Sequence, residues 1–214
     1  MSVDLLERCR AVATSTWSDV LDGLGVPGVI SGLVLRSGTG CVAGTALTVK
    51  ETVGSLGSYP VDAFTVGSFL DAISPGAMLI VDMGGAAVST FGGLAAQATV
   101  QGGAAGVVID GGCRDVADIR ASGIWLSSRH VTPTSGKGRV NVEGINVPIT
   151  VCGIGVSPGD WIIGDETGIV CVKADLLIDA LTIAEELTTR DIRFADALRG
   201  GDTFSATAAR LRHM

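Results

Sequence analysis

Short apolar runs alternate with helix-like segments in the middle of the chain, and their lengths separate strands from helices. Met78–Met83 and Gly106–Asp110 are almost wholly apolar, which is typical of strands buried on both faces of a parallel sheet. Each run leads through glycines into a segment with helical spacing, Gly92–Gly102 in the first case and Val116–Ser122 in the second. This alternation predicts an α/β fold with a parallel core.

Segments on either side of this core predict further strands and helices. Strands are expected at Cys41–Val53, Ile124–Ser127, Val147–Val151, Trp161–Asp165 and Ile169–Val172. Short turns between the later strands indicate a mixed, only partly parallel sheet. Helices are expected over residues 1–24 (with Thr14, Ser15 or Thr16 as an N-cap), over Tyr59–Ile73, and from Ala174 to about Leu198.

No linker divides the chain, so we expect a single domain over residues 1–214. Within it we expect an N-terminal helical region (1–24) and a C-terminal helix and tail (174–214). The composition adds to this picture, because the 214 residues are 47% hydrophobic and 17% charged, with a formal net charge of −7. The excess of apolar residues must be buried in the core or between subunits, which suggests a homo-oligomer.

The same composition argues against several classes of protein. No apolar stretch reaches the ~20 residues that span a bilayer, so a membrane protein is not expected. No run of Lys and Arg suits a phosphate backbone, which makes nucleic-acid binding an unfavoured function. Charged residues occur too early in the chain for a signal peptide, which favours a cytoplasmic protein.

The scarcity of histidine limits the kinds of metal site that the chain can build. His130 and His213 are its two histidines, and none of its five cysteines forms a C-x-x-C pair. Structural zinc is therefore poorly supported, and any metal would be held mainly by carboxylates and water. That chemistry favours Mg²⁺ or Mn²⁺.

The segment GVVIDGGCRDVAD, from Gly106 to Asp118, carries the clearest candidate chemistry. A buried strand ends at Asp110, Gly111-Gly112 is expected to turn the chain, and Arg114-Asp115 opens a helix. Ligands of open α/β sheets bind beyond the carboxyl ends of strands, where an Arg and an Asp can hold a carboxylate and a divalent ion together. Alternatively, Asp115 is only an N-cap, and Arg114 pairs with Asp110 or Asp118.

A second segment, Asp82–Ala96, has the same form of strand, glycine-rich loop and helix. Backbone N–H groups of residues 91–95 are candidates to cradle an anion, although the loop can also be explained as a tight turn with close packing. Two such loops on neighbouring parallel strands would face one cleft. His130, at the end of the next strand, either faces that cleft as an acid–base group or is a satisfied loop histidine.

These segments together resemble the class II 4-hydroxy-4-methyl-2-oxoglutarate/4-carboxy-4-hydroxy-2-oxoadipate aldolases, whose family also contains the regulator of ribonuclease activity A. The resemblance runs from about Thr14 to Arg199 and rests on four motifs. They are GVVIDGGCRD at Gly106–Asp115, FGGL at Phe91–Leu94, RHVTP at Arg129–Pro133, and V-x-P-G-D…D-E-x-G-I-V at Val156–Val170. The resemblance implies an α/β/β sandwich that assembles as a homotrimer or a hexamer, with the active site at a subunit boundary.

The resemblance also implies a role for each candidate residue. Asp115 would ligate Mg²⁺ or Mn²⁺, and Arg114 would be the catalytic residue that contacts the oxygens of a 2-keto acid. Backbone amides of Gly92, Gly93, Leu94 and Ala95 would bind its carboxylate, and Asp191 of the adjacent subunit would support the metal through water. The implied activity is cleavage of a 4-hydroxy-2-keto acid to pyruvate and a carbonyl product, with oxaloacetate decarboxylation as a side activity.

One position departs from the family pattern. Members usually carry Asp or Glu in the loop where this chain has Gly93, and that carboxylate is thought to manage a proton and water near the substrate. Without it, the proton would come from metal-bound water, or from Tyr59, His130 or Asp110. Two alternatives to the aldolase therefore stay open: a non-catalytic regulatory or binding protein, and a lyase or isomerase acting on a different hydroxy-keto acid.

Overall fold

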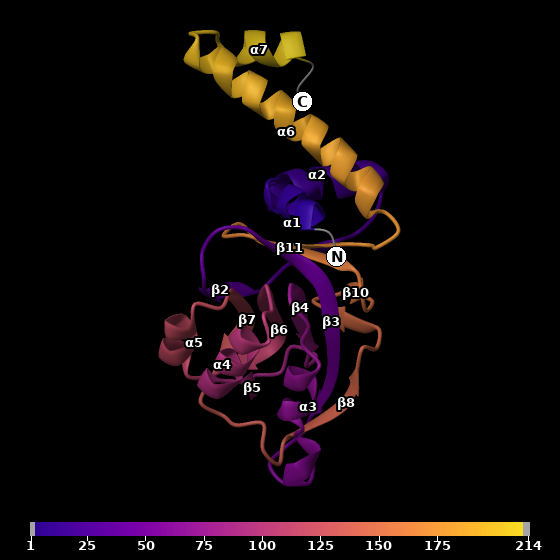
Figure 1. Cartoon of the computed structure of the whole chain (residues 1–214), viewed down its shortest axis with the longest axis vertical. Coiled ribbons are helices and arrows are strands. Elements are labelled where there is room, and N and C mark those ends of the chain that lie inside the picture. Colours follow the sequence, from indigo (N-terminus) through magenta and orange to yellow (C-terminus); the bar gives the residue numbers. More distant parts are fainter. Residues whose placement is uncertain (1–2, 212–214) are drawn as a thin grey trace.

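Four parallel strands form the centre of a mixed sheet, in the order β3, β4, β6 and β7 (Figure 1). The computed structural model describes residues 3–211, so His213 and the outermost residues of both predicted terminal regions lie outside it. The strands are β3 (Val42–Val53), β4 (Ala77–Asp82), β6 (Gly106–Cys113) and β7 (Leu126–Val131). All residues of β4 and β6 are buried, as their apolar sequences predict.

Antiparallel strands extend this parallel core on both sides. Strand β2 (Val34–Ser37) pairs with β7, and β11 (Trp161–Gly164), β12 (Ile169–Val172) and β1 (Val29–Ile30) follow one another beyond β3. The far half of β3 pairs instead with β8 (Val140–Ile145), and β5 (Ser89–Phe91) lies beside the end of β6. A separate hairpin is formed by β9 (Ile149–Val151) and β10 (Ile154–Val156).

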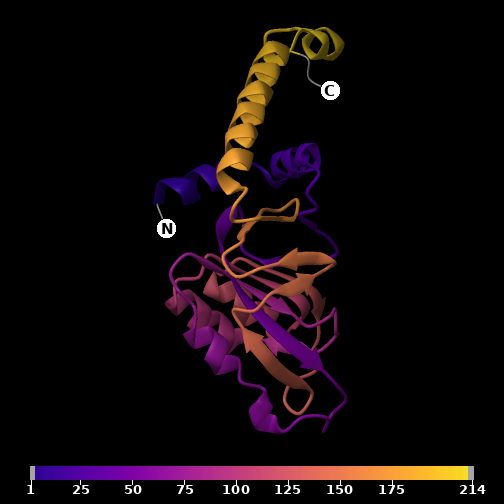
Figure 2. The same cartoon turned by 90° about the vertical axis from the view of Figure 1, so that its right-hand side faces the viewer.

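Two different layers cover the two faces of the central strands. Helices α3 (Val66–Asp71), α4 (Gly93–Gln101) and α5 (Val116–Ser122) cover one face, where Phe69, Ala96 and Ile119 pack into the same apolar cluster as Leu79 and Ile109. On the other face, residues of the β9–β10 hairpin and of β12 pack against Ile80 and Val108. The order of helix, sheet and strand layers confirms the expected mixed α/β sandwich (Figures 1 and 2).

The remaining helices lie at one end of the sheet. Helices α1 (Val3–Arg10) and α2 (Thr14–Leu24) lie near the start of α6 (Leu177–Arg199), which extends away from the body of the molecule (Figure 2). Helix α7 (Phe204–Leu211) folds back on its far end, where the ring centroids of Phe194 and Phe204 are 4.9 Å apart. This confirms the expected C-terminal helical segment. None of the helices described within residues 3–211 has the length and apolarity needed to cross a membrane.

The predicted N-cap within residues 1–24 is wrong. Two helices form there, separated at residues 11–13, and Ala13 occupies the N-cap position of α2 without a side-chain hydrogen bond. The Thr14 hydroxyl donates instead to Asp165 Oδ1 at 2.7 Å, and the Thr14 amide donates to Asp165 Oδ2 at 3.0 Å. A distant carboxylate therefore satisfies the helix start in place of a local hydroxyl.

The helix predicted over Tyr59–Ile73 is also wrong in its extent. Only a 3-10 turn (η1, Val61–Ala63) and the six-residue α3 form within it. The segment contains Pro60, Gly67 and several β-branched residues, all of which have weak helix propensity. Of the residues that form these two elements, only Phe69 is buried, so packing does little to compensate.

The turn predicted at Gly111-Gly112 does not occur, because β6 continues to Cys113. The pairing of β6 with β7 shifts register between Ile109 and Gly112. A Cβ atom on Gly112 would lie 2.5 Å from the carbonyl oxygen of Val88, and one on Gly111 would overlap the side chain of Met83. These glycines therefore permit close packing around an irregular strand and do not form a turn.

Candidate active site

The two glycine-rich loops identified in the sequence meet at one cavity. Strand β5 leads into α4 on one side, β6 leads through Arg114-Asp115 into α5 on the other, and the two helices pack together. The cavity has a volume of about 190 Å³. Its lining combines both loops with residues from two other segments: Phe64, Val66, Ser89, Thr90, Phe91, Gly92, Gly93, Leu94, Ala95, Arg114, Asp115, Ser135 and Lys137.

Asp115 occupies a backbone conformation that few residues other than glycine adopt. Its φ is +53° and its ψ is 44°, a left-handed geometry that Asp tolerates better than most side chains. It stands at the N-cap position of α5 but makes no capping hydrogen bond with its side chain. Its Oδ2 accepts a hydrogen bond from the Gly93 amide at 3.3 Å, so this carboxylate is directed at the α4 loop and the cavity.

Arg114 lies beside Asp115 and not beside the alternative partners. Its Nε is 3.5 Å from Asp115 Oδ2, and both side chains are 43% exposed. An ion pair this open and this long is weak and partly hydrated, so a ligand can compete for either member. The alternative pairing of Arg114 with Asp110 is wrong, because Asp110 binds Arg129 at 2.6 Å.

Position 92 requires glycine, because the side chains of Arg114 and Asp115 lie too close to its Cα to leave room for a Cβ atom. A Cβ atom at Gly92 would lie 2.6 Å from Asp115 Oδ2 and 3.2 Å from Arg114 Cγ. The first-turn amides of α4 have no carbonyl partner within the helix, and the helix dipole makes this end electropositive. Since Gly93 donates to Asp115, the amides of Leu94 and Ala95 are the ones available to an anion.

Asp118 fills the space that a side chain at Gly93 would need. A Cβ atom on Gly93 would lie 2.7 Å from Asp118 Cβ and 2.9 Å from Asp118 Oδ2. The sequence suggests Asp118 only as an ion-pair partner of Arg114 and does not reveal this placement. The spacing between Asp115 and Asp118 could have indicated it, because residues three apart at the start of a helix project to the same side.

Lys137 is a second lining residue that the sequence did not single out. It is exposed in the loop before β8 and faces the same cavity as Arg114. Together these two side chains place positive charge beside the amides of α4. The lining therefore suits a small anion with several oxygen atoms.

The carboxylates next to Gly93 fit a hard divalent cation. Mg²⁺ is usually bound through one or two carboxylates and keeps several waters, with the substrate supplying further oxygens. Asp115 and Asp118 provide such a pair. Among residues 3–211, no cluster of three or more His, Cys, Asp or Glu side chains forms a ligand cage. The residues present thus match an open Mg²⁺ or Mn²⁺ site better than a closed one.

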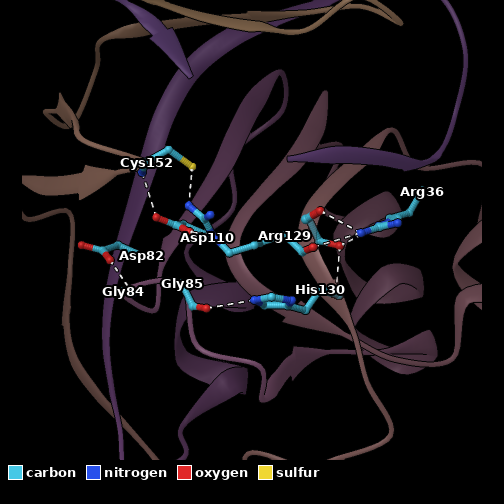
Figure 3. Close-up of polar contacts among 9 residues, drawn as sticks. Arg36, Asp82, Gly84, Gly85, Asp110, Arg129, His130 and Cys152 are labelled. Atoms are coloured by element: carbon cyan, nitrogen blue, oxygen red, sulfur yellow. Dashed lines mark hydrogen bonds and ion pairs between the residues drawn. The ribbon is translucent and has the colours of Figure 1, made fainter. Parts of the chain in front are cut away.

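Asp110 and His130 lie in a different cavity, of about 730 Å³ (Figure 3). Asp110 Oδ1 accepts from Arg129 Nε at 2.6 Å, and its Oδ2 accepts from the Cys152 amide at 2.8 Å. His130 Nε2 is 3.0 Å from the carbonyl oxygen of Gly85. Both side chains are satisfied by protein partners, so the suggestion that either faces the cleft of Arg114 is wrong.

Two other candidates, Asp191 and Tyr59, lie apart from the cavity of Arg114. Asp191 is on α6, on the part of the molecule that extends away from α4 and α5 (Figure 1). Tyr59 is adjacent to Gly138 and is not among the cavity-lining residues of the described chain. Cys113 is fully buried, and burial raises the pKa of its thiol, which agrees with a packed cysteine.

Fold and site define an α/β/β sandwich protein with a small polar cavity between two helix starts at the ends of parallel strands. The RraA-like family model, described as Aldolase/RraA, matches residues 14–171, and the chain belongs to this family.

Several known proteins are similar to this chain. An uncharacterized protein from Pseudomonas syringae pv. tomato has a structure with a TM-score of 0.85 at 25% identity, covering 97% of this chain and 98% of that chain. RraAS2 of Streptomyces coelicolor, described as an unusual member of the RNase ES inhibitor RraA protein family, shares the fold with a TM-score of 0.79 at 21% identity, covering 89% of this chain and 95% of its own. The uncharacterized protein MJ0644 of Methanocaldococcus jannaschii is 34% identical over 90 residues, which are 42% of this chain and 43% of MJ0644. The match therefore spans less than half of that relative.

Proposed function

We propose that the protein is a metal-dependent lyase that cleaves a 4-hydroxy-2-keto acid to pyruvate and a carbonyl product. Oxaloacetate decarboxylation would be a side activity, and Mg²⁺ or Mn²⁺ the cofactor. The observation that carries the proposal is that Arg114 and Asp115 face one cavity with the Leu94 and Ala95 amides at the start of α4. Membership of a family described as Aldolase/RraA supports the same class of reaction.

The cavity offers separate partners to the carboxylate and to the neighbouring keto oxygen of such a substrate. The amides of Leu94 and Ala95 bind the carboxylate, and Lys137 adds positive charge at the rim. The Arg114 guanidinium donates to the keto oxygen, where negative charge develops as the carbon–carbon bond breaks. The aromatic walls formed by Phe64 and Phe91 limit the access of water on the inner side.

Asp115 and Asp118 are the residues that would hold the metal. When bound, a divalent ion supplies Lewis-acid polarisation of the keto oxygen. The Gly93 amide fixes the orientation of Asp115 by donating to its Oδ2 at 3.3 Å. The left-handed backbone at Asp115 then turns Arg114 and Asp115 toward the same opening.

Pyruvate release provides the test. Oxaloacetate and 4-hydroxy-4-methyl-2-oxoglutarate are supplied with Mg²⁺, with Mn²⁺ or with EDTA, and pyruvate is followed over time. We expect release with either metal, loss in EDTA, and loss in Arg114→Ala. The exposed Arg10→Ala on α1 is the matched control for removing an arginine. Release that resists EDTA, or near-normal turnover in Arg114→Ala, contradicts the proposal.

A regulatory or binding protein is the second candidate. Leu94 is 84% exposed at the edge of the cavity, which is unusual for a large apolar side chain and suits contact with another protein. The Streptomyces neighbour is described as belonging to a family of ribonuclease inhibitors. Metal binding without pyruvate release from either substrate would favour this candidate, or a lyase or isomerase with a different hydroxy-keto acid substrate.

Assembly as a homotrimer or hexamer and a cytoplasmic location complete the proposal. The extended α6–α7 segment exposes large apolar side chains in the single protomer, including Ile178, Ile192 and Phe204. In such an assembly, as the family resemblance implies, Asp191 of one copy would support the metal site of the adjacent copy. Light scattering coupled to size exclusion tests the assembly, and a monomer at micromolar concentration contradicts it.

A further inference from the structure

Glu51 lies directly behind the candidate active site, on the helix-covered face of β3. Lys50 and Glu51 are consecutive residues of β3 and point to opposite faces of the sheet, as alternation along a strand requires. Lys50 reaches the larger cavity, where its Nζ binds Asp82 at 2.7 Å. Glu51 turns inward and is only 1% exposed, among apolar residues of the core such as Val49 and Val53.

One hydroxyl connects Glu51 to the cavity of Arg114. The Thr90 hydroxyl donates to Glu51 Oε1 at 2.7 Å, and Thr90 itself lines that cavity. The hydroxyl oxygen keeps lone pairs that can accept a proton from a bound molecule. Thr90 is therefore placed between a ligand in the cavity and a carboxyl group in the core.

The second oxygen of this carboxyl group is unsatisfied. Among residues 3–211, Glu51 Oε2 has no hydrogen-bond partner although it is buried. A buried carboxylate in this state is costly, and a proton relieves the cost. Burial accordingly raises the pKa of Glu51 to about 7, against a smaller lowering by the Thr90 hydrogen bond.

Within residues 3–211, no charged neighbour explains the raised pKa of Glu51. The cross-strand partner of Glu51 on β8 is the apolar Val142, and the charged residue next to it, Glu143, is exposed. Lys50 and Asp82 pair with each other in the other cavity. On the side of β5, the group that contacts Glu51 is the neutral Thr90.

We propose that Thr90 and Glu51 form a proton relay for the candidate active site, an inference that rests on the proposed lyase function. The Thr90 oxygen accepts the proton of the substrate's 4-hydroxyl while passing its own proton to Glu51 Oε1. The C3–C4 bond breaks, its electron pair forms the pyruvate enolate, and C4 becomes a carbonyl. The proton on Glu51 then returns through Thr90 to C3, which gives pyruvate and restores both residues.

This relay supplies what Gly93 cannot. Gly93 has no side chain, and Asp118 fills the adjacent space at the exposed rim of the cavity. Glu51 approaches from the core instead. Burial there raises its pKa to about 7, so the carboxyl group can take up and release a proton near neutral pH. Because Glu51 acts through Thr90, it is a positioning residue that also stores the proton.

The test compares two reactions in the full-length protein with Mg²⁺. Cleavage of 4-hydroxy-4-methyl-2-oxoglutarate requires removal of a hydroxyl proton, whereas decarboxylation of oxaloacetate does not. We expect Glu51→Gln and Thr90→Val to lower kcat for cleavage by about 10²-fold, a typical general acid–base contribution, and to lower decarboxylation less, because that reaction shares only the return of a proton to C3. The pH dependence of kcat near 7 should disappear in Glu51→Gln, and Thr90→Ser should restore cleavage.

Glu143→Gln, on the neighbouring strand, is the matched control and should match wild type in both reactions. Unchanged cleavage and an unchanged pH profile in Glu51→Gln overturn the relay. Equal losses of both reactions overturn it too, since they indicate a structural role. Absence of pyruvate release from both substrates in the wild type overturns the proposed function and the relay with it.

A measurement without turnover separates these cases further. With ¹³C in the carboxyl group of every glutamate side chain, Glu51→Gln assigns the Glu51 signal. We expect this signal to titrate near pH 7, and its midpoint to rise in Thr90→Val because the lowering hydrogen bond is gone. A midpoint at the ordinary glutamate value, or one that ignores Thr90→Val, overturns the relay whether or not the protein is a lyase.

Discussion

Replacing Glu51 by glutamine should change how the stability of the fold depends on pH. Burial raises the pKa of this carboxyl to about 7 from an ordinary value of 4.5. Below pH 4.5 the group is protonated in both the folded and the unfolded chain, so its contribution is fully retained. As the pH rises toward 7, the unfolded chain releases the proton and the folded chain does not. Stability is therefore lost through this interval, and the loss is complete once the pH exceeds the folded pKa.

The size of the loss follows from the two pKa values. Each tenfold change in an ionisation constant is worth about 1.4 kcal/mol, so the full interval corresponds to about 3 kcal/mol. Because Glu51 is only 1% exposed, solvent screens its charge very little and this free energy needs no large reduction. Between pH 5 and pH 8 most of the interval is crossed, and wild type should lose about 2 to 3 kcal/mol relative to Glu51→Gln.

Urea unfolding at pH 5 and pH 8 measures this difference. Wild type, Glu51→Gln and the exposed control Glu143→Gln are compared at one protein concentration, because assembly shifts apparent stability. The glutamine carries no titrating proton, so its own packing cost is the same at both pH values and cancels. Parallel pH dependence in wild type and Glu51→Gln would refute the reasoning, whatever the absolute stabilities.

The remaining predictions concern the two acidic residues at the rim and their neighbours. Gly93→Asp should lower the melting temperature and the pyruvate-release rate, because its Cβ would lie 2.7 Å from Asp118 Cβ, and the added change Asp118→Gly should recover both. No recovery in the double variant contradicts the steric argument. Asp115→Asn should abolish Mg²⁺ binding in calorimetry, whereas Arg114→Ala should retain it and lose about 10²- to 10³-fold in kcat. Equal metal affinity in both variants would contradict the separation of roles.

Elements whose burial is uniform were predictable from the sequence. Strands β4 and β6 are buried throughout and read as continuous apolar runs. Helix α5 also forms over the predicted Val116–Ser122, although only Ile119 in it is buried. Strands β2, β8 and β10 were missed, as were β1 and β5, which are only two and three residues long. Such short segments have no periodicity of their own and become strands only through pairing with a neighbour.

The candidate site was predictable to the extent that strand order determines it. Since β4 and β6 are parallel neighbours, the loops that follow them meet at one edge, which brings Arg114 and Asp115 to the start of α4. The contributions of Asp118 and Glu51 were not predictable in this way. Each depends on which side chain occupies a space left by another, and sequence spacing does not specify that.

In the proposed relay, Glu51 takes over the proton that the family resemblance assigns to a carboxylate at position 93, while Asp118 fills the space beside that position. Asp118 is exposed at the rim, where it can serve as a metal ligand, and Glu51 is buried, where its pKa is raised to about 7. Different surroundings thus suit two carboxyl groups to different tasks. In Gly93→Asp with Asp118→Gly, a carboxylate at position 93 would handle the proton again. Glu51→Gln should therefore cost less cleavage activity in that background than in wild type, and the double-mutant cycle measures the coupling. Equal losses in the two backgrounds would show that Glu51 and position 93 act independently, which would contradict this division.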